Sequence, residues 1–408
     1  MPPRRRNSAA TVLLFTAYIA STYGFGLYLF PAMVESIRGD IPFSYGTMGT
    51  ISGFVQAGFM VCALLAGFLT VRLGALPMIL GSIAVCALAL AGLAIAPDIV
   101  SMAVLLTALG GAAAAIWVPM VEVARHRIAR EHQAKALGLI SSGTSYGVFI
   151  NSFLLTALMP SQGWRALWVA TAAIVAVLAI LGLVILKPPE RKSSAGSDAQ
   201  ALSLRARVKA LPAGLTAAIV FMMFLNGLSC MPYQTYLSAF LQDEAGYSAA
   251  TAAHAWRVIG LVGMVSGFAV GALADRITVR LGMLFTYCVL ASSCLLLLAA
   301  RGGDNFAALY VATVTFGGSF YAVFGLVPAY IGHFFGSGSA ALVFAFGNIA
   351  LGLGGIVGNA FGGWLKVSSG SFAPIYIVML AAAVASAALS AAMPCEKRAR
   401  VEALPANA

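Results

Sequence analysis

The stretch VGALADRIT (270–278) has a weaker counterpart, AGFLTVRLG (66–74), in the first half of the chain. Each follows directly on a run of apolar residues. At an offset of 204 residues their glycines and arginines coincide, Gly67 with Gly271 and Arg72 with Arg276. The same offset pairs Phe43-Ser44 with Tyr247-Ser248, and Val-Pro recurs at 118–119 and 327–328. Self-similarity at a fixed spacing is the sequence signature of a duplicated structural unit, so the chain is predicted to have two related halves.

The composition excludes a soluble protein. Of 408 residues, 61% are hydrophobic and only 9% are charged, whereas soluble domains carry about 25% charged residues. Apolar runs of roughly twenty residues recur from end to end, each long enough to cross a bilayer as a helix. The first run continues to Val34, too long for a cleaved leader, and is expected to remain as a helix. The sequence therefore predicts an all-α polytopic membrane protein with twelve spans, near 11–34, 46–68, 77–96, 99–122, 136–159, 166–186, 213–238, 250–273, 281–300, 305–330, 341–365 and 372–393.

The basic residues indicate the topology. With an even number of spans, one side holds 19 Lys and Arg and the other holds four, while Arg257 falls inside a span. Because basic residues accumulate in cytoplasmic loops, both termini are expected in the cytoplasm and the chain in the inner membrane. The formal charge of +11 is therefore attributed to topology, and no nucleic-acid partner is expected. The predicted units are a first bundle (1–186), a basic linker (187–212), a second bundle (213–393) and a tail (394–408).

GALADRITVR (271–280) resembles the cytoplasmic signature of the major facilitator superfamily, with a glycine, an Asp-Arg pair and a further basic residue. The resemblance implies two six-helix bundles that alternate access to a central site. Glycines 138, 143 and 147, GWR (163–165) and FGGSFYAVFGLVPAYIGHFFG (316–336) resemble the monocarboxylate-porter and oxalate/formate-antiporter branches. Two positions depart from these patterns. Val71 stands where the signature has an aspartate, and Gly267 stands where the organic-anion branches have an arginine.

Enzymatic and ATP-driven activities have no support in the sequence. It contains no phosphate-binding loop of the G-x-x-x-x-G-K-[ST] type. The four histidines are scattered, and the six cysteines lack the paired spacing of a metal site or a disulfide framework. We therefore expect neither an enzyme nor a cofactor, but a monomeric transporter whose partners are a small solute, the bilayer and protons.

Charged residues inside spans are costly and mark functional sites. Arg257 is the eighth residue of its predicted span, and His254 lies three residues earlier on the same helical face. We expect Arg257 to bind an anionic group, with His254 beside it as a donor or a titrating group. Two alternatives remain, an Arg257 side chain that reaches the interface beside an anchoring Trp256, and an ion pair with Asp243 or Glu244.

Polar side chains near the middle of spans complete the predicted binding site. Those on one stripe of the seventh span are Asn226, Tyr233 and Gln234. The others are Tyr28, Gln56, Asn151, Tyr321 and Asn348. For each of them, hydrogen bonding between helices is the alternative. A site of Asn, Gln and Tyr with one cation suits a small polar or monoanionic solute, and a carboxylate moved with protons is the favoured prediction. Glu35 and His254 are the candidate coupling residues.

The family resemblance also implies a cytoplasmic gate. Asp275, in the preserved signature, is expected to meet a neighbouring helix N-terminus and nearby arginines when that side is closed. The remaining candidate gating residues are Arg276, Arg72 and Arg125. Alternative functions are an exporter of amphipathic compounds, a uniporter, and a membrane sensor that moves no solute.

Overall fold

The computed structural model describes residues 3–128, 130–186 and 211–396, and over these ranges it contains helices and no strand. The linker, 187–212, therefore lies almost wholly outside the described residues, and so does most of the tail. The first span consists of α1 (Pro3–Ile19), the π-helical turn η1 (Ala20–Phe25) and α2 (Gly26–Asp40). The rest of the first half comprises α3 (Tyr45–Leu73), α4 (Ala75–Ile95), α5 (Ile99–Arg127), α6 (Arg130–Ser141) and α7 (Gly143–Ile185). The second half comprises α9 (Ala213–Ala239) with the π-helical turn η2 (Phe240–Glu244), α10 (Ala249–Arg276), α11 (Val279–Ala299), α12 (Phe306–Phe334), α13 (Ser337–Ser369) and α14 (Ala373–Ala392).

Over the described ranges the helices confirm the predicted all-α polytopic membrane fold. Eleven described segments are long and apolar enough to cross a membrane. One of them, Ala136–Ile185, has 50 residues, or about 75 Å of helix, against a hydrocarbon core of about 30 Å. It turns back at Gly163, whose φ of 74° and ψ of 178° are not helical. Glycine adopts this backbone conformation without a Cβ penalty, so the segment is two spans.

The sequence repeat has a structural cause at the start of α3 and α10. Ser44 accepts a hydrogen bond from the backbone N–H of Thr47 at 3.0 Å, and Ser248 accepts one from Thr251 at 3.1 Å. In both places the serine hydroxyl also lies 3.0 Å from the threonine hydroxyl. The aligned serines are therefore equivalent N-caps, which satisfy the first free N–H groups of the two helices.

Glycines bring equivalent helices of each half into close contact. A Cβ on Gly147 of α7 would collide with the Ala20 carbonyl and with Gly24 in the first span. In the second half, a Cβ on Gly354 of α13 would collide with the Phe224 carbonyl of α9. The small-residue packing typical of membrane helices thus occurs at the same helix pair in both halves.

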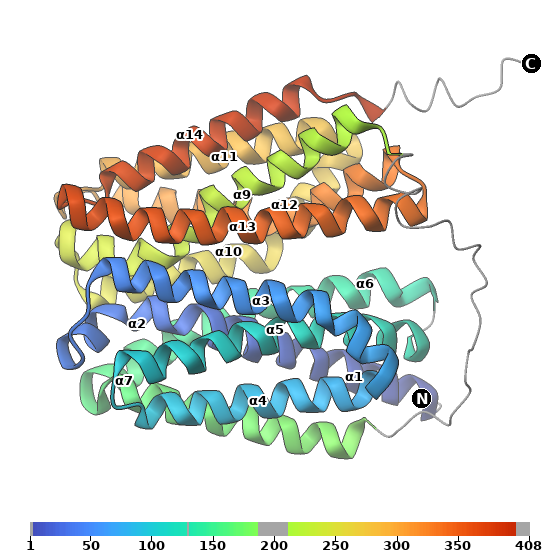
Figure 1. Cartoon of the computed structure of the whole chain (residues 1–408), viewed down its shortest axis with the longest axis horizontal. Coiled ribbons are helices and arrows are strands. Elements are labelled where there is room, and N and C mark those ends of the chain that lie inside the picture. The colour runs from blue at the N-terminus through green and yellow to red at the C-terminus, as the bar shows by residue number, and fades with distance from the viewer. Residues whose placement is uncertain (1–2, 129, 187–210, 397–408) are drawn as a thin grey trace, which may run out of the picture.

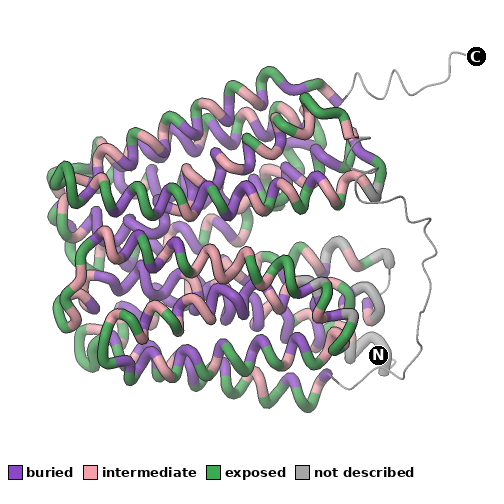
Figure 2. Tube along the Cα trace, viewed as in Figure 1, coloured by how far each residue is buried: buried purple, intermediate pink, exposed green. Residues whose placement is uncertain are grey.

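The two halves meet at one end of the molecule and spread apart toward the other. We call the end at which α1 begins and α14 ends the terminal end, and the opposite one the far end (Figure 1). Contacts between the halves run along α3 and α13, α7 and α10, and α2 and α9. On α3, Met48 and Ile51 near the far end are buried, whereas Leu64 and Phe68 nearer the terminal end are exposed. Figure 2 shows how buried and exposed residues are distributed along the helices. The structure is therefore closed at the far end and open at the terminal end.

Candidate functional site

A small cavity lies between the halves, directly below the closed far end. It is lined from α2, α3, α5, α9 and α13 by Gly26, Leu27, Tyr28, Phe30, Pro31, Ser52, Val55, Gln56, Leu106, Met231, Gln234, Thr235 and Asn359. Four of the six polar lining residues, Tyr28, Gln56, Gln234 and Asn359, lie ten to twelve residues from the far ends of their spans. This corresponds to about 15–18 Å of helix, close to the middle of the bilayer.

Three predicted binding residues converge on this cavity. Tyr28 and Gln234 are 8% and 4% exposed, and their side chains lie beside each other. Gln56 packs against α13, where Gly352 and Gly355 leave room for its side chain. Their hydroxyl and carboxamide groups can both donate and accept hydrogen bonds. The lining contains no carboxylate, ammonium, guanidinium or imidazole, so its chemistry is that of neutral hydrogen bonding.

Three further polar residues line the cavity and were not predicted from the sequence, Ser52, Thr235 and Asn359. The one with a carboxamide is Asn359. It is 3% exposed, and its Oδ1 accepts no hydrogen bond from the described residues. Its backbone carbonyl accepts a 2.5 Å hydrogen bond from the buried Tyr236 hydroxyl and packs against Gly49 of the other half. The sequence could have identified Asn359 by its position in mid-span among glycines, because a polar residue at that depth needs a partner.

Arg257 lies at the contact between the halves and does not line the cavity. Its guanidinium donates to the Ser152 hydroxyl at 3.2 Å, the Ser152 carbonyl at 3.4 Å and the Thr156 hydroxyl at 3.1 Å. It also lies 4.1 Å from the centre of the Phe153 ring. All these partners belong to α7 in the first half. No described carboxylate lies within ion-pair distance of Arg257, so its charge is balanced by neutral dipoles and a ring.

The alternative predictions for Arg257, a place at the interface beside Trp256 and an ion pair with Asp243 or Glu244, differ from the observed contacts. Trp256 is 1% exposed and donates to the Ser238 hydroxyl at 2.9 Å inside the second half. Asp243 pairs with Lys366 at 3.1 Å, and Glu244 pairs with Lys366 at 3.2 Å. Trp256 is thus a buried packing residue, and the two acids have other partners.

Three further candidates lie within the halves. Asn226 is fully buried, and its Oδ1 accepts from the Cys230 thiol at 3.4 Å. Tyr233 stacks on Phe316 at 3.8 Å between ring centres, and its hydroxyl accepts from Ser293. Asn151 donates at 2.7 Å to the Gly24 carbonyl in η1, so it ties α7 to the π-helical turn of the first span.

The remaining candidates lie around the cavity or at the surface. Tyr321 packs against Gly263, where Ser145 also lies, and is close to Tyr28. Asn348 is exposed and donates to the Phe344 carbonyl of its own helix. His254 is exposed near the far end. The structure therefore brings Tyr321 near the cavity and leaves the other two residues apart from it.

Glu35 belongs to a charged and aromatic cluster that closes the far end. Its carboxylate accepts from the Tyr45 hydroxyl at 3.0 Å and pairs with Arg38 at 3.1 Å. The Tyr45 ring lies 3.8 Å from the Arg38 guanidinium and 5.5 Å from the ammonium of Lys366, which belongs to the other half. The Phe372 ring packs against Tyr45 at 4.9 Å. Glu35 is thus connected through Tyr45 to the surface where the halves meet.

The predicted gating residues lie at the open terminal end. Asp275 and Arg276 are exposed, and no ion pair of theirs occurs within the described ranges. Arg72 is also exposed and lies over the Phe68 ring of its own helix at 4.3 Å. The side chain of Arg125 lies outside the described part of the chain. An open terminal end accounts for the exposure of Asp275, Arg276 and Arg72.

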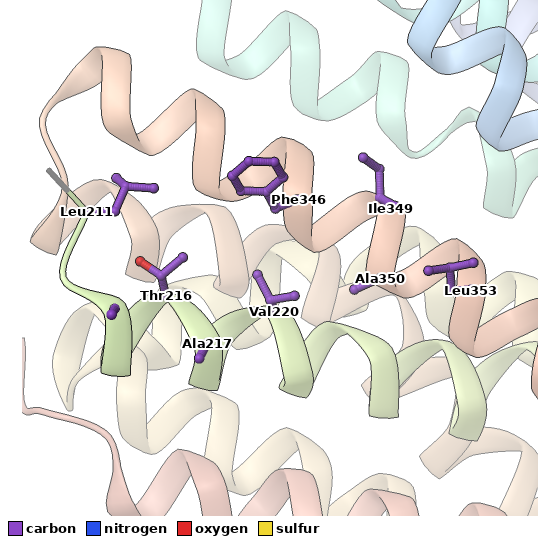
Figure 3. Close-up of a pocket in the computed structure, with 9 residues that line it drawn as sticks. Leu211, Thr216, Ala217, Val220, Phe346, Ile349, Ala350 and Leu353 are labelled. Atoms are coloured by element: carbon purple, nitrogen blue, oxygen red, sulfur yellow. The ribbon is translucent and has the colours of Figure 1, made fainter. Parts of the chain in front are cut away.

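A second hollow lies between α9 and α13 toward the terminal end (Figure 3). It is lined by Leu211, Ala213, Thr216, Ala217, Val220, Phe346, Ile349, Ala350 and Leu353. The Thr216 hydroxyl is the one polar side-chain group among these residues. Such a groove suits an apolar chain, whereas the cavity near Tyr28 suits a polar solute.

Comparison with known proteins identifies the family. The model of the Major Facilitator Superfamily matches residues 14–359. The chain belongs to this superfamily. None of the curated proteins compared with the chain matches it in sequence. Among solved structures, a bacterial homolog of the human lysosomal transporter Spinster, in an inward-facing and unoccupied conformation, has a TM-score of 0.73 at 14% identity, and the match covers 98% of each chain. A mutant of the nucleoside transporter NupG has a TM-score of 0.75 at 14% identity, over 95% of this chain and 99% of that one. At this identity the structures show the shared fold of a multi-pass membrane transporter, whereas the resemblance to particular branches stays a prediction.

Proposed function

We propose that the protein is a secondary transporter that moves a small polar solute across the inner membrane by alternating access. The observation that carries this proposal is the convergence of Tyr28, Gln56, Gln234 and Asn359 on one mid-membrane cavity between the halves. Parallel halves around a midplane site are the common architecture of such transporters.

The excess of basic residues supports an orientation with the terminal end in the cytoplasm. In that orientation the far end, closed by α3 with α13 and by α7 with α10, faces outward. The arrangement is then the inward-facing state. Solute would leave toward the cytoplasm, and the cavity would be loaded from outside after the far end opens.

A neutral polar solute fits the cavity best. A carboxylate bound there would have to give up its hydration without meeting a positive charge, because the lining residues supply only neutral groups. A small organic anion is the second candidate, and one observation favours it. The guanidinium of Arg257 has no carboxylate partner among the described residues, so it is available to an anion once the far end opens.

Proton coupling through Glu35 is part of the proposal. Glu35 is a carboxylate in a span, hydrogen-bonded to Tyr45 in the surface between the halves. Loss of its charge on protonation would weaken its contact with Arg38 and so alter the closure of the far end. His254, exposed on α10, is the alternative proton carrier.

The experiment is solute uptake by proteoliposomes that contain the purified protein. Uncharged polar solutes and small carboxylates are compared, with and without an imposed pH gradient. Uptake of an uncharged solute supports the first candidate, and uptake of a carboxylate that Arg257→Ala abolishes supports the second. Uptake that is independent of the pH gradient indicates a uniporter. The absence of flux for every solute tested contradicts the transporter proposal.

A further inference from the structure

Asn359 has a backbone carbonyl that the protein holds in place and a side-chain oxygen that has no hydrogen-bond partner among the described residues. The Tyr236 hydroxyl fixes its backbone carbonyl, and Gly49 of the first half allows α3 to approach that carbonyl closely. Tyr236 is itself fully buried and packs on Phe372 at 5.6 Å. The backbone of Asn359 is therefore rigid while the halves are closed at the far end.

Asn359 lines the cavity, and its carboxamide carries unused hydrogen-bonding capacity. The residue lines the cavity and is 3% exposed, yet no described group donates to its Oδ1. A buried acceptor without a donor costs free energy, and a ligand that supplies the donor recovers it. The unpaired atom therefore indicates a contact that the solute completes.

A carboxamide offers one acceptor and, from its NH₂ group, donors on the same planar edge. Its best complement is another planar edge with an N–H donor next to a carbonyl acceptor, as in amides, imides and cyclic ureas. If the oxygen and nitrogen of the amide were assigned the other way round, the side chain would still present one donor next to one acceptor. The same kind of solute edge would therefore fit. Gln56 and Gln234 supply two more carboxamides to the same cavity.

We propose that Asn359 is a specificity-determining residue that pairs with an amide-type edge of the solute. This inference rests on the proposed function and narrows it, because it names the solute as an uncharged compound with adjacent N–H and C=O groups. A carboxylate has acceptors and no N–H donor, so it would leave the oxygen of the carboxamide unpaired.

The test uses matched pairs of probes on the full-length purified protein. Succinimide is compared with N-methylsuccinimide, and hydantoin with its N,N′-dimethyl derivative, by thermal shift and then by calorimetric titration. Methylation removes the one N–H donor of succinimide and both N–H donors of hydantoin, and it keeps the carbonyls. We expect the N–H compound to bind at least tenfold more tightly than its methylated partner. Equal affinities within both pairs, or no binding of either N–H compound, overturn the inference.

The variant Asn359→Leu removes both hydrogen-bonding ends, keeps the branching at Cγ and is expected to reduce the preference within each pair to less than twofold. Ser368→Ala serves as the control, because Ser368 is exposed on the same helix and donates to Leu365. If Asn359→Leu still binds the N–H compounds more tightly than their methylated partners, another residue recognises the N–H group. This result overturns the proposed role of Asn359. The wild-type comparison stands by itself if this variant does not fold. Uptake of a solute without an amide edge overturns this inference alone, whereas absence of all flux overturns the proposed function.

Discussion

Replacing Arg257 by alanine is expected to open the far end of the transporter. The side chain makes three hydrogen bonds and one ring contact to α7 across the surface between the halves. Hydrogen bonds between membrane helices average about 0.6 kcal/mol each, and a cation–π contact adds about 0.5–1 kcal/mol. The closed state should therefore lose about 2–3 kcal/mol, a change of about 30- to 150-fold in the ratio of closed to open molecules.

The measurement is the distance between spin labels at Ser161 and Ala250, which are exposed near the far ends of α7 and α10. The labels are attached to introduced cysteines in a background without the six native cysteines. Arg257→Ala should raise the population with the longer distance. Arg165→Ala is the matched control, because its partners Asp40 and Trp164 belong to its own half. Identical distance distributions in wild type and Arg257→Ala would refute the reasoning.

Three further predictions concern the cavity, coupling and packing. Gln234→Leu should lower the affinity for the transported solute about tenfold, as measured by calorimetric titration; an unchanged affinity would remove Gln234 from the site. Glu35→Gln should leave uptake by proteoliposomes insensitive to an imposed pH gradient, since the glutamine cannot exchange a proton; retained sensitivity would assign coupling to another group. Gly147→Ala should lower the melting temperature by roughly 5 °C, because its methyl group collides with the Ala20 carbonyl. Gly138→Ala, where a Cβ meets nothing within 4 Å, should keep or raise it, and equal effects of the two changes would contradict the packing argument.

The architecture could be predicted because it follows from hydropathy and repetition. Apolar length fixes the spans, and the equivalent N-caps Ser44 and Ser248 record the duplication. The turn at Gly163 lies between two predicted spans, so it changes no boundary by more than a few residues. The π-helical turn η1 had no sequence signal, because it depends on how α7 packs against the first span.

The site could be predicted only in part. Tyr28, Gln56 and Gln234 were identifiable because polar side chains in mid-span are costly, and the structure brings them together. For Arg257 the sequence indicates depth in the membrane but not the facing helix, so its contacts with α7 could not be foreseen. Asn359 had the same mid-span signal as Asn348, and only the packing of α13 against α3 distinguishes the two.

The most direct test of the central claim is a structure of the purified protein with a transported solute bound. We expect the solute between the two halves, in hydrogen-bonding distance of Tyr28, Gln56, Gln234 and Asn359. A solute found in the apolar groove between α9 and α13, beside Val220 and Phe346, with the central cavity empty, would contradict the account.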